Sequence, residues 1–523
     1  MRTIDSPVLT PAFKILSRSP ASRLTAGGVL KRHPLERILA KPLTRKVLAI
    51  LSKPRSNGRS LFEALAENYD NPRLTGWERW KWRLPNLLID ALLAHYRLDK
   101  ELMKRKLFHH PPTVRALTLT ARSIARYGLS APQRFAAPLF VVWNITQLCN
   151  LACKHCYQNA GPRPAADELT LEERLRVVDE LADNGVPFLA IAGGEPLALK
   201  DLWPVLEYAN RRGLHLTLAT NGTLLVPETA ARLKECGVKY VEVSVDGLDP
   251  NEHDAFRGRK GAWARAVQGI RNAVNAGIRT GLATCFTRRN VHRASEVIEF
   301  AIDLGCQTFS HFNFIPVGRG REIVEEDLTP AQRERLLATL QRYLAEGRIN
   351  VISTAPQFAR ACIVYGPAEG VFATGHAGRG MGQKTMVLSR YIGGCGAGRC
   401  YCSIQPNGKL TPCVYLSSVQ AGDLRRQSLA EIWESDLFAL LSDRSRRGDH
   451  CAVCDYKAYC GGCRARALAY TGDITAGDPG CAYNTPLWRE LVAKADEQLP
   501  VLEPLSVAGA GRTEKLSMGG GLS

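Results

Sequence analysis

The sequence of 523 residues lacks an apolar run long enough to cross a lipid bilayer. Its longest apolar stretches, such as residues 84–96, are interrupted by Asp90 and stop short of the roughly 18 to 20 residues that a spanning helix needs. We therefore expect no membrane-spanning helix.

An export signal is also missing from the start of the chain. Residues 1–20 include Asp5 and have no continuous apolar core followed by a small-residue cleavage site. We therefore expect a cytoplasmic protein, whose sixteen cysteines serve metal or redox chemistry in a reducing compartment rather than disulfides. With 45% hydrophobic and 23% charged residues, the composition is that of a folded globular protein.

Acidic residues are scarce in the first quarter of the chain. Residues 1–135 hold 26 Lys and Arg against 9 Asp and Glu, a net charge of +17 out of +19 for the whole sequence. This imbalance marks residues 1–135 as a separate region. We expect a basic arm to about residue 60, followed by helices with apolar runs such as residues 84–107.

Tryptophans and cations alternate in this basic region, where segment 77–83 reads WERWKWR. Indole rings next to cations are typical of proteins that contact anionic membrane surfaces, so peripheral membrane binding is our hypothesis for the region. Two alternatives stay open. The segment is a solvated basic surface whose tryptophans pack on the next domain, or it contacts nucleic acid, which is the least favoured because no nucleic-acid-binding motif is present.

Short apolar runs alternate with amphipathic segments from Pro138 onward, which is typical of βαβ units around a parallel sheet. The first of the expected helices has a capping box at Thr170 and Glu173 and a stop signal at Gly185. The expected strands are residues 139–146, 187–192, 214–220, 238–245, 278–286 and 307–315. Six repeats favour a barrel-like α/β fold with its ligand site at the carboxyl ends of the strands.

Three cysteines follow the first expected strand directly. Cys149, Cys153 and Cys156 are spaced C-x3-C-x2-C in one loop, so their thiolates can face one iron-sulfur cluster. Because a closed site takes four ligands, three protein ligands leave one iron open to a small molecule. The alternative is a zinc site completed by His155 or by a distant residue.

These cysteines and further motifs resemble the radical S-adenosylmethionine (SAM) superfamily. Tyr157 follows the third cysteine directly. The second strand ends in GGEP at 193–196, the third ends in TNG at 220–222, and the fourth ends in SVDG at 244–247, after which comes HDAFRG at 253–258. The resemblance implies that SAM binds at these places, together with a backbone element at 316–320. The SAM-binding candidates are Tyr157, Gly193, Gly194, Glu195, Pro196, Asn221, Ser244 and Arg257.

The resemblance also implies the fold and the reaction. We expect an α/β fold with a partial (β/α)6 TIM-like barrel, an N-terminal basic helical region and a small C-terminal cysteine-rich cluster-binding domain. SAM would chelate the open iron and be cleaved to a 5'-deoxyadenosyl radical, which removes hydrogen from an unactivated C–H bond. The sequence identifies no general base, so the catalytic residues stay unknown.

Nine more cysteines lie between residues 391 and 490 and resemble the SPASM domain, which holds auxiliary iron-sulfur clusters. The resemblance implies that Cys395, Cys400, Cys413 and Cys463 hold the nearer cluster and that Cys451, Cys454, Cys460 and Cys481 hold the farther one. Two features depart from the family pattern: the x2 spacing between Cys460 and Cys463, and Cys402, which competes with Cys400. A pair of zinc knuckles is the alternative. Cys236, Cys285, Cys306 and Cys362 are expected to be ordinary buried thiols.

These patterns divide the chain into five parts. The expected parts are a basic arm and helical region at 1–135, a radical SAM partial barrel at 136–330, a bridging helix and Gly-rich loop at 331–390, a SPASM-like domain at 391–490 and a C-terminal tail at 491–523.

The sequence leaves the substrate open. If each auxiliary cluster has four thiolates, neither offers an open iron, so the clusters relay electrons in a net oxidation. The expected partners are a reductant such as flavodoxin or ferredoxin and a substrate that is a peptide, a tetrapyrrole propionate or a lipid-like molecule. A noncatalytic iron-sulfur electron carrier or scaffold is the alternative of another class.

Overall fold

The computed structural model describes residues 34–53, 59–95, 99–366, 371–373, 379–381 and 389–493. The first part of the expected basic arm, residues 1–33, lies outside the described residues. So does nearly all of the expected C-terminal tail. The prediction that helices begin only after about residue 60 is wrong, because residues 34–52 already form two helices.

All six expected strands are present, each within its predicted range. They are β1 (Phe140–Asn144), β2 (Phe188–Ala192), β3 (His215–Thr220), β4 (Tyr240–Ser244), β5 (Arg279–Phe286) and β6 (Thr308–Asn313). Each strand pairs in parallel with the next one in the chain. The prediction of a parallel α/β fold is therefore confirmed.

The sheet is an open barrel that four further strands extend. β7 (Asn350–Ser353) continues the parallel order beyond β6, whereas β10 (Tyr401–Ile404) adds in parallel to β1 at the opposite edge. β11 (Lys409–Thr411) and β12 (Gly422–Asp423) follow β10 as antiparallel strands. Since β7 and β12 are the two edge strands and do not pair with each other, the barrel is partial, as expected.

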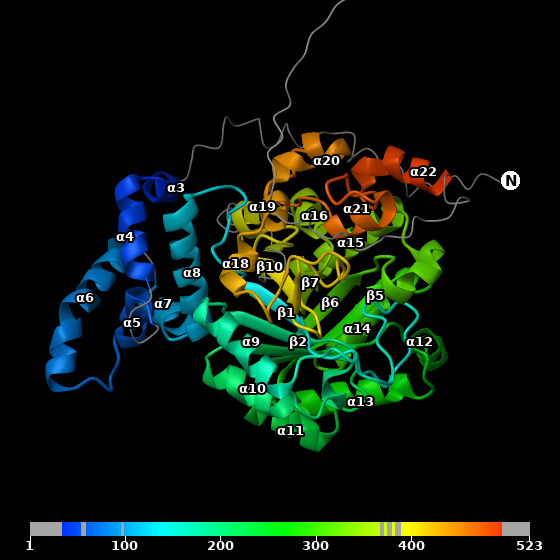
Figure 1. Ribbon diagram of the computed structural model, residues 1–523, viewed down its shortest axis with the longest axis horizontal. Coiled ribbons are helices and arrows are strands. Elements are labelled where there is room, and N and C mark those ends of the chain that lie inside the picture. The colour runs from blue at the N-terminus through cyan, green and yellow to red at the C-terminus, as the bar shows by residue number, and fades with distance from the viewer. Residues whose placement is uncertain are drawn as a thin grey trace, which may run out of the picture.

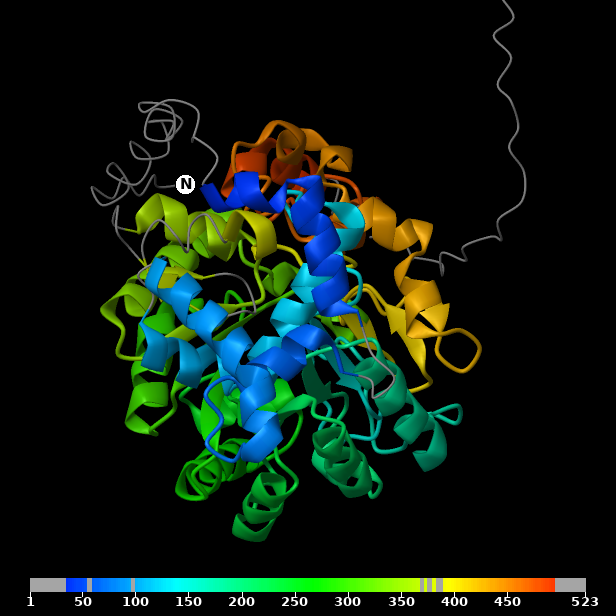
Figure 2. The same ribbon diagram turned by 90° about the vertical axis from the view of Figure 1, so that its left-hand side faces the viewer.

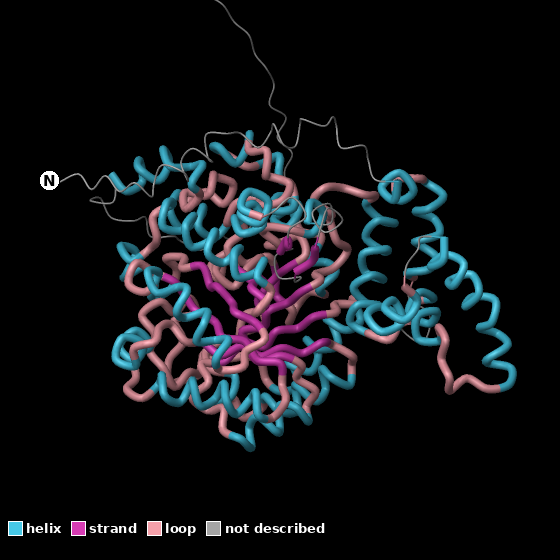
Figure 3. Tube along the Cα trace, turned by 180° about the vertical axis from the view of Figure 1, so that it is seen from behind, coloured by secondary structure: helices cyan, strands magenta, loops and turns pink. Residues whose placement is uncertain are grey.

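Helices cover the outer face of the sheet, and Figure 3 shows the strands gathered at the centre of a ring of helices. These helices are α9 (Leu171–Asp183), α10 (Leu202–Arg211), α11 (Pro227–Glu235), α12 (Pro250–Arg257), α13 (Ala262–Asn275) and α14 (Ala294–Asp303). α9 begins at the predicted capping box, because the Thr170 hydroxyl accepts from Glu173 N at 3.3 Å and Glu173 Oε2 accepts from Thr170 N at 2.8 Å. Fully buried strand residues such as Leu189 and Ile191 pack beneath these helices.

The basic region folds into helices on one side of the barrel (Figure 1). They are α3 (Pro34–Leu39), α4 (Pro42–Ser52), α5 (Leu61–Asn68), α6 (Gly76–His95), α7 (Lys100–Met103), a π-helix (Lys104–Phe108) and α8 (Pro111–Tyr127). α8 joins this unit to the barrel, since Arg115 donates to the carbonyl of Arg212 at 2.9 Å. No helix in the described ranges meets the length and hydropathy needed for a membrane span.

The C-terminal domain lies over one end of the barrel (Figure 1). The expected bridging helix is α15 (Pro330–Glu346), which is followed by β7 and α16 (Gln357–Tyr365). The short strands β8 (Val371–Ala373) and β9 (Arg379–Met381) form a separate antiparallel pair. The cysteine-rich part contains α18 (Leu429–Trp433), α19 (Asp436–Ser442), α20 (Asp449–Val453), α21 (Arg464–Thr471) and α22 (Thr485–Ala493).

Candidate active site

The first cysteine loop begins where β1 ends. Cys149 N donates to the carbonyl of Gly161 at 2.6 Å, which closes the loop at its base. Cys149 and Cys153 are buried, Cys156 is half-buried, and all three thiols are free. The three side chains line one cavity of about 140 Å³, so the fold brings the predicted ligand set together.

Arg319, in the Gly-rich element that follows β6, holds this loop in place. Its Nε donates to the carbonyl of Cys153 and its Nη1 to the carbonyl of Ala160, both at 2.8 Å. The Arg319 backbone N also donates to the carbonyl of Cys156 at 3.0 Å. The element at 316–320 therefore supports the cysteine loop from the far edge of the barrel.

The GGEP element forms part of the cavity wall. Gly193 has φ +136°, and a Cβ there would lie 2.6 Å from the carbonyl oxygen of Thr146, so only glycine allows this close approach. Gly193 and Gly194 line the cavity, whereas Glu195 and Pro196 are not among its lining residues. The Glu195 carboxylate instead accepts from Thr220 Oγ1 at 2.7 Å and from Asn221 N at 2.8 Å. Glu195 therefore ties the ends of β2 and β3 together.

Two other SAM-binding candidates lie on the same cavity. Asn221, after β3, donates from Nδ2 to Asn150 Oδ1 at 2.8 Å, and Ser244 ends β4. Both line the cavity with the three cysteines. Tyr157 lines it as well, and its hydroxyl donates to Asn144 Oδ1 at 3.2 Å.

Arg257 places a buried positive charge beside the cysteine loop. Its Nε lies 2.6 Å from Asp246 Oδ2, and its Nη1 lies 3.9 Å from Cys153 Sγ. Burial opposes ionisation of Asp246, but the Arg257 guanidinium outweighs that effect and lowers the carboxyl pKa to about 2. The arrangement offers a fixed cation next to the thiols, at the carboxyl end of β4.

The loop fits an iron-sulfur cluster on its own chemistry. Burial raises the pKa of Cys149 to about 12, so its thiolate needs a bound cation such as iron. Within the described ranges, no three His, Cys, Asp or Glu side chains are spaced for one shared metal ion. In a cubane, by contrast, each thiolate binds a different iron.

A second cavity of about 270 Å³ lies inside the barrel and adjoins the first. Tyr157, Glu242, Phe312 and Tyr415 line both cavities. Sequence reasoning missed Glu242, although it shares a strand face with Ser244, two positions on. Glu242 is the one carboxyl group among the described residues lining these cavities, and burial raises its pKa.

Cysteines of the C-terminal domain line the far side of this larger cavity. Cys395, Cys413 and Cys463 are all lining residues. The Cys400 sulfur lies 3.0 Å from the position that a Cβ on Gly396 would take, next to Cys395. The side chain of Cys402 is instead fully buried in the apolar core on β10.

The remaining four predicted ligands lie together in a small separate cavity, which is lined by Cys451, Cys454, Cys460 and Cys481. Backbone N–H groups point at two of these sulfurs. Gly462 N donates to Cys460 Sγ at 3.4 Å and Asp478 N donates to Cys451 Sγ at 3.5 Å. Such hydrogen bonds to sulfur are among the features that set cluster potentials.

Five cysteines lie outside the predicted ligand sets, and all are buried: Cys236, Cys285, Cys306, Cys362 and Cys402. Cys285, on β5, also lines the cavity of the first cysteine loop. The sequence did not predict this position of Cys285 in the cavity wall.

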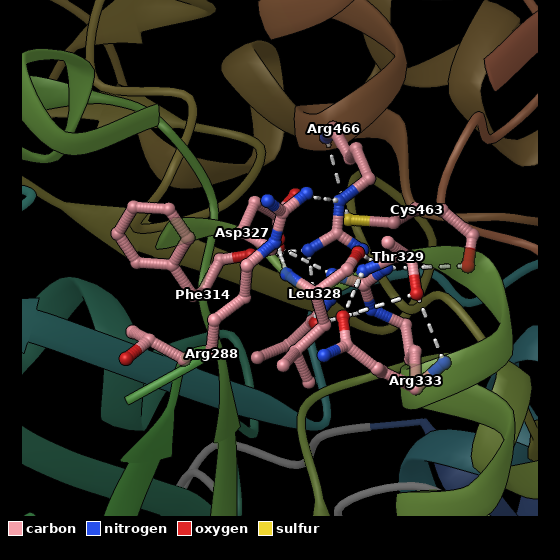
Figure 4. A network of polar contacts seen from close by, with 12 residues as sticks. Arg288, Phe314, Asp327, Leu328, Thr329, Arg333, Cys463 and Arg466 are labelled. Atoms are coloured by element: carbon pink, nitrogen blue, oxygen red, sulfur yellow. Dashed lines mark hydrogen bonds and ion pairs between the residues drawn. The ribbon is translucent and has the colours of Figure 1, made fainter. Parts of the chain in front are cut away.

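A buried ionic network joins the C-terminal domain to the barrel (Figure 4). Asp327, which precedes α15, forms ion pairs with Arg333 and with Arg466 of α21, and it accepts from Tyr470 at 2.8 Å. Arg466 lies three residues after Cys463, whose sulfur accepts from Arg466 N at 3.4 Å. The network therefore fixes the position of a predicted cluster ligand relative to the barrel.

Two family models match the chain. Residues 143–301 match the radical SAM superfamily, and residues 395–463 match SPASM, an iron-sulfur cluster-binding domain.

The chain is similar to individual proteins that are named as enzymes of different kinds. The AdoMet-dependent heme synthase of Methanosarcina barkeri (strain Fusaro / DSM 804) is 36% identical over 349 residues, which cover 66% of this chain and 97% of that enzyme. The mycofactocin maturase MftC of Mycolicibacterium smegmatis (strain ATCC 700084 / mc(2)155) is 31% identical over 352 residues, which cover 66% of this chain and 83% of that protein. The crystal structure of Streptococcus suis SuiB bound to its precursor peptide SuiA shares the fold, with a TM-score of 0.58 at 17% identity, over 81% of this chain and 93% of that chain.

The fold, the cysteine loop and these relatives define an iron-sulfur enzyme that uses SAM. The chain belongs to the radical SAM superfamily and carries a C-terminal SPASM domain. Its cofactors are a [4Fe-4S] cluster, SAM and auxiliary iron-sulfur clusters, and it reductively cleaves SAM to a 5'-deoxyadenosyl radical.

Proposed function

We propose that this enzyme oxidises an unactivated C–H position on a side chain of a heme-type tetrapyrrole. The observation that carries the proposal is the cavity of about 270 Å³ inside the barrel. Tyr157 and Glu242 connect it to the cavity of the first cysteine loop, and Cys413 lies on its other side. A substrate held there lies between the SAM site and the nearer auxiliary cluster.

The ligand assignments belong to this proposal. Cys149, Cys153 and Cys156 hold the SAM-binding cluster. Cys395, Cys400, Cys413 and Cys463 hold the nearer auxiliary cluster, and Cys451, Cys454, Cys460 and Cys481 hold the farther one. The SAM contacts are Tyr157, Gly193, Gly194, Asn221, Ser244 and Arg257, with Glu195 and Pro196 shaping the wall. Four thiolates at each auxiliary cluster leave no iron open to substrate, so these clusters relay electrons.

The lining of the larger cavity favours a tetrapyrrole. Aromatic side chains such as Phe140, Phe312 and Tyr401 make the wall largely apolar, which suits a flat ring system. The 36% identity to a heme synthase over nearly that whole enzyme points to the same class. A peptide is the second candidate, favoured by the maturase MftC and by SuiB, which binds the peptide SuiA.

Glu242 is the polar anchor in this cavity. The Tyr240 hydroxyl donates to Glu242 Oε2 at 3.2 Å and lies 3.4 Å from Ser310 Oγ. Burial raises the pKa of Glu242, so its carboxyl group holds a proton more readily than an exposed glutamate, and in the protonated form it donates a hydrogen bond to a substrate carboxylate. A carboxylate-bearing side chain is thereby oriented next to the SAM site.

We place the enzyme in the cytoplasm with flavodoxin or ferredoxin as its reductant, in peripheral contact with an anionic membrane. The test of substrate class is anaerobic turnover with propionate-bearing tetrapyrroles deuterated on the side chains. Deuterium in 5'-deoxyadenosine together with a mass change of the tetrapyrrole supports the proposal. Deuterium transfer from a peptide but from none of the tetrapyrroles overturns it in favour of the second candidate.

A further inference from the structure

The N-terminal helical unit presents apolar side chains that the other described residues leave exposed. α4 packs on α8, where Arg45 Nη2 donates to the carbonyl of Ala125 at 3.0 Å. Leu43, Val47 and Ile50 lie on another face of α4, and Leu43 is 73% exposed. Their spacing of four and three residues places them in one stripe along the helix.

α6 carries a second apolar stripe and lies farthest from the barrel (Figures 1 and 2). Trp77 is 69% exposed and Trp80 is 64% exposed, and their rings stack with centroids 4.7 Å apart. Leu84, Leu87 and Leu88 continue the stripe at helical spacing and are exposed as well. Trp82 and Leu93 lie on the buried side of the helix, so α6 is apolar on two faces, and the face that carries Trp77 and Trp80 is more than half exposed.

This concentration is unusual within the molecule. The described chain has twelve exposed large hydrophobic side chains, and nine lie on α3, α4 and α6. They are Ile38, Leu43, Val47, Ile50, Trp77, Trp80, Leu84, Leu87 and Leu88. Clustered exposed apolar side chains mark an interaction surface.

The charge around this surface identifies the kind of partner. Arg79, Lys81 and Arg83 are exposed on α6, and none of them forms an ion pair within the described residues. Residues 1–135 carry a net charge of +17. A positively charged surface repels a second copy of this chain and attracts an anionic one.

We propose that the exposed face of α4 and α6 binds an anionic lipid bilayer. Trp77 and Trp80 lie at the depth of the lipid headgroups, Leu84, Leu87 and Leu88 enter the acyl boundary, and the neighbouring cations contact anionic headgroups. Exposed indoles beside leucines and cations are the combination that an interfacial helix uses. The inference rests on this surface alone and does not depend on the substrate.

Flotation of the reconstituted full-length enzyme with lipid vesicles tests the proposal. We expect flotation with vesicles of equal parts phosphatidylcholine and phosphatidylglycerol, and little with phosphatidylcholine alone. The double variant Trp77→Ala, Trp80→Ala loses flotation. A second variant, Lys81→Gln with Arg83→Gln, binds about fivefold more weakly for each charge removed. Val453→Ala removes an equally exposed apolar side chain on α20 and leaves flotation unchanged.

Three results would overturn the proposal. The first is equal flotation with neutral and anionic vesicles or none with either. The second is wild-type flotation of both multiple variants, whose folding is checked by circular dichroism and iron content. The third is a stable dimer in sedimentation velocity that the double tryptophan variant dissociates, because it assigns the face to a second copy of the chain.

Discussion

Arg257 Nε lies 2.6 Å from Asp246 Oδ2, and Arg257 lines the cavity of the first cysteine loop. Replacing the acid leaves a buried guanidinium without its counter-charge beside Cys153. We expect Asp246→Asn to lower the free energy of unfolding by about 3 to 5 kcal/mol, measured by urea titration, because an uncompensated buried charge is expensive. As a control, Glu172→Gln removes the acid of an exposed i,i+4 pair with Arg176. It changes the free energy of unfolding by at most about 0.5 kcal/mol.

The same pair predicts a pH dependence. The pKa of Asp246 is lowered from 3.8 to about 2, so the folded state favours the ionised carboxylate. Its stabilisation is fully present above about pH 4 and is lost as the pH falls toward 2. Urea titrations across this range should show a steeper loss of stability for the wild type than for Asp246→Asn. Equal slopes would contradict the assigned pKa shift.

Iron content distinguishes Cys400 from Cys402 as a cluster ligand. The Cys400 sulfur lies close to Gly396, next to Cys395, whereas the Cys402 side chain is fully buried in the core. We expect Cys400→Ala to lose about four irons per chain and Cys402→Ala to keep them. Normal iron content in Cys400→Ala with loss in Cys402→Ala would reverse the assignment.

The network around Asp327 predicts coupling between the two halves of the enzyme (Figure 4). Asp327→Asn leaves Arg333 and Arg466 without their shared anion, at a site where all three side chains are buried. We expect a loss of about 3 to 5 kcal/mol in the free energy of unfolding, together with faster proteolysis between the barrel and the cysteine-rich domain. Glu346→Gln, which removes the acid of a solvent-exposed pair on α15, is the matched control and leaves both unchanged. Wild-type stability of Asp327→Asn would show that the network does not hold the domains together.

Glu242 predicts a separation of SAM cleavage from product formation. Glu242→Leu removes the polar anchor, so we expect oxidised product to fall about a hundredfold while 5'-deoxyadenosine still forms. Glu242→Gln keeps a hydrogen-bond donor and retains most of the product. Product and 5'-deoxyadenosine are quantified together by mass spectrometry, with exposed Glu235→Gln as control. Equal losses in the Leu and Gln variants would argue against hydrogen bonding as the role of Glu242.

Much of the barrel could be predicted because its strands alternate with helices along the sequence. Each of the six expected strands forms within its range, and the motifs at 193–196 and 220–222 lie at the carboxyl ends of β2 and β3. β10 could not be found in this way, because it joins β1 from about 260 residues away and only the tertiary fold brings the two together. β7 is only four residues long, which gives a weak periodic signal.

Some residues of the site could not be predicted because their roles depend on contacts that form only in the folded protein. Glu242 carries no recognisable motif, although the alternation of Tyr240, Glu242 and Ser244 along one strand already places all three on one face. The role of Glu195 in tying β2 to β3 depends on side chains from two strands. Sequence spacing grouped the cysteines, whereas the choice between Cys400 and Cys402 needs the side-chain positions.

Cleavage of SAM at the cluster of the first cysteine loop is the reaction on which the other assignments depend. The most direct measurement is anaerobic: reconstitute the full chain with iron and sulfide, add dithionite and SAM, and quantify 5'-deoxyadenosine by mass spectrometry beside Cys156→Ala. We predict 5'-deoxyadenosine from the wild type and none from Cys156→Ala. A fully loaded wild type that binds no SAM and forms no 5'-deoxyadenosine, or equal formation by the variant, would contradict the account.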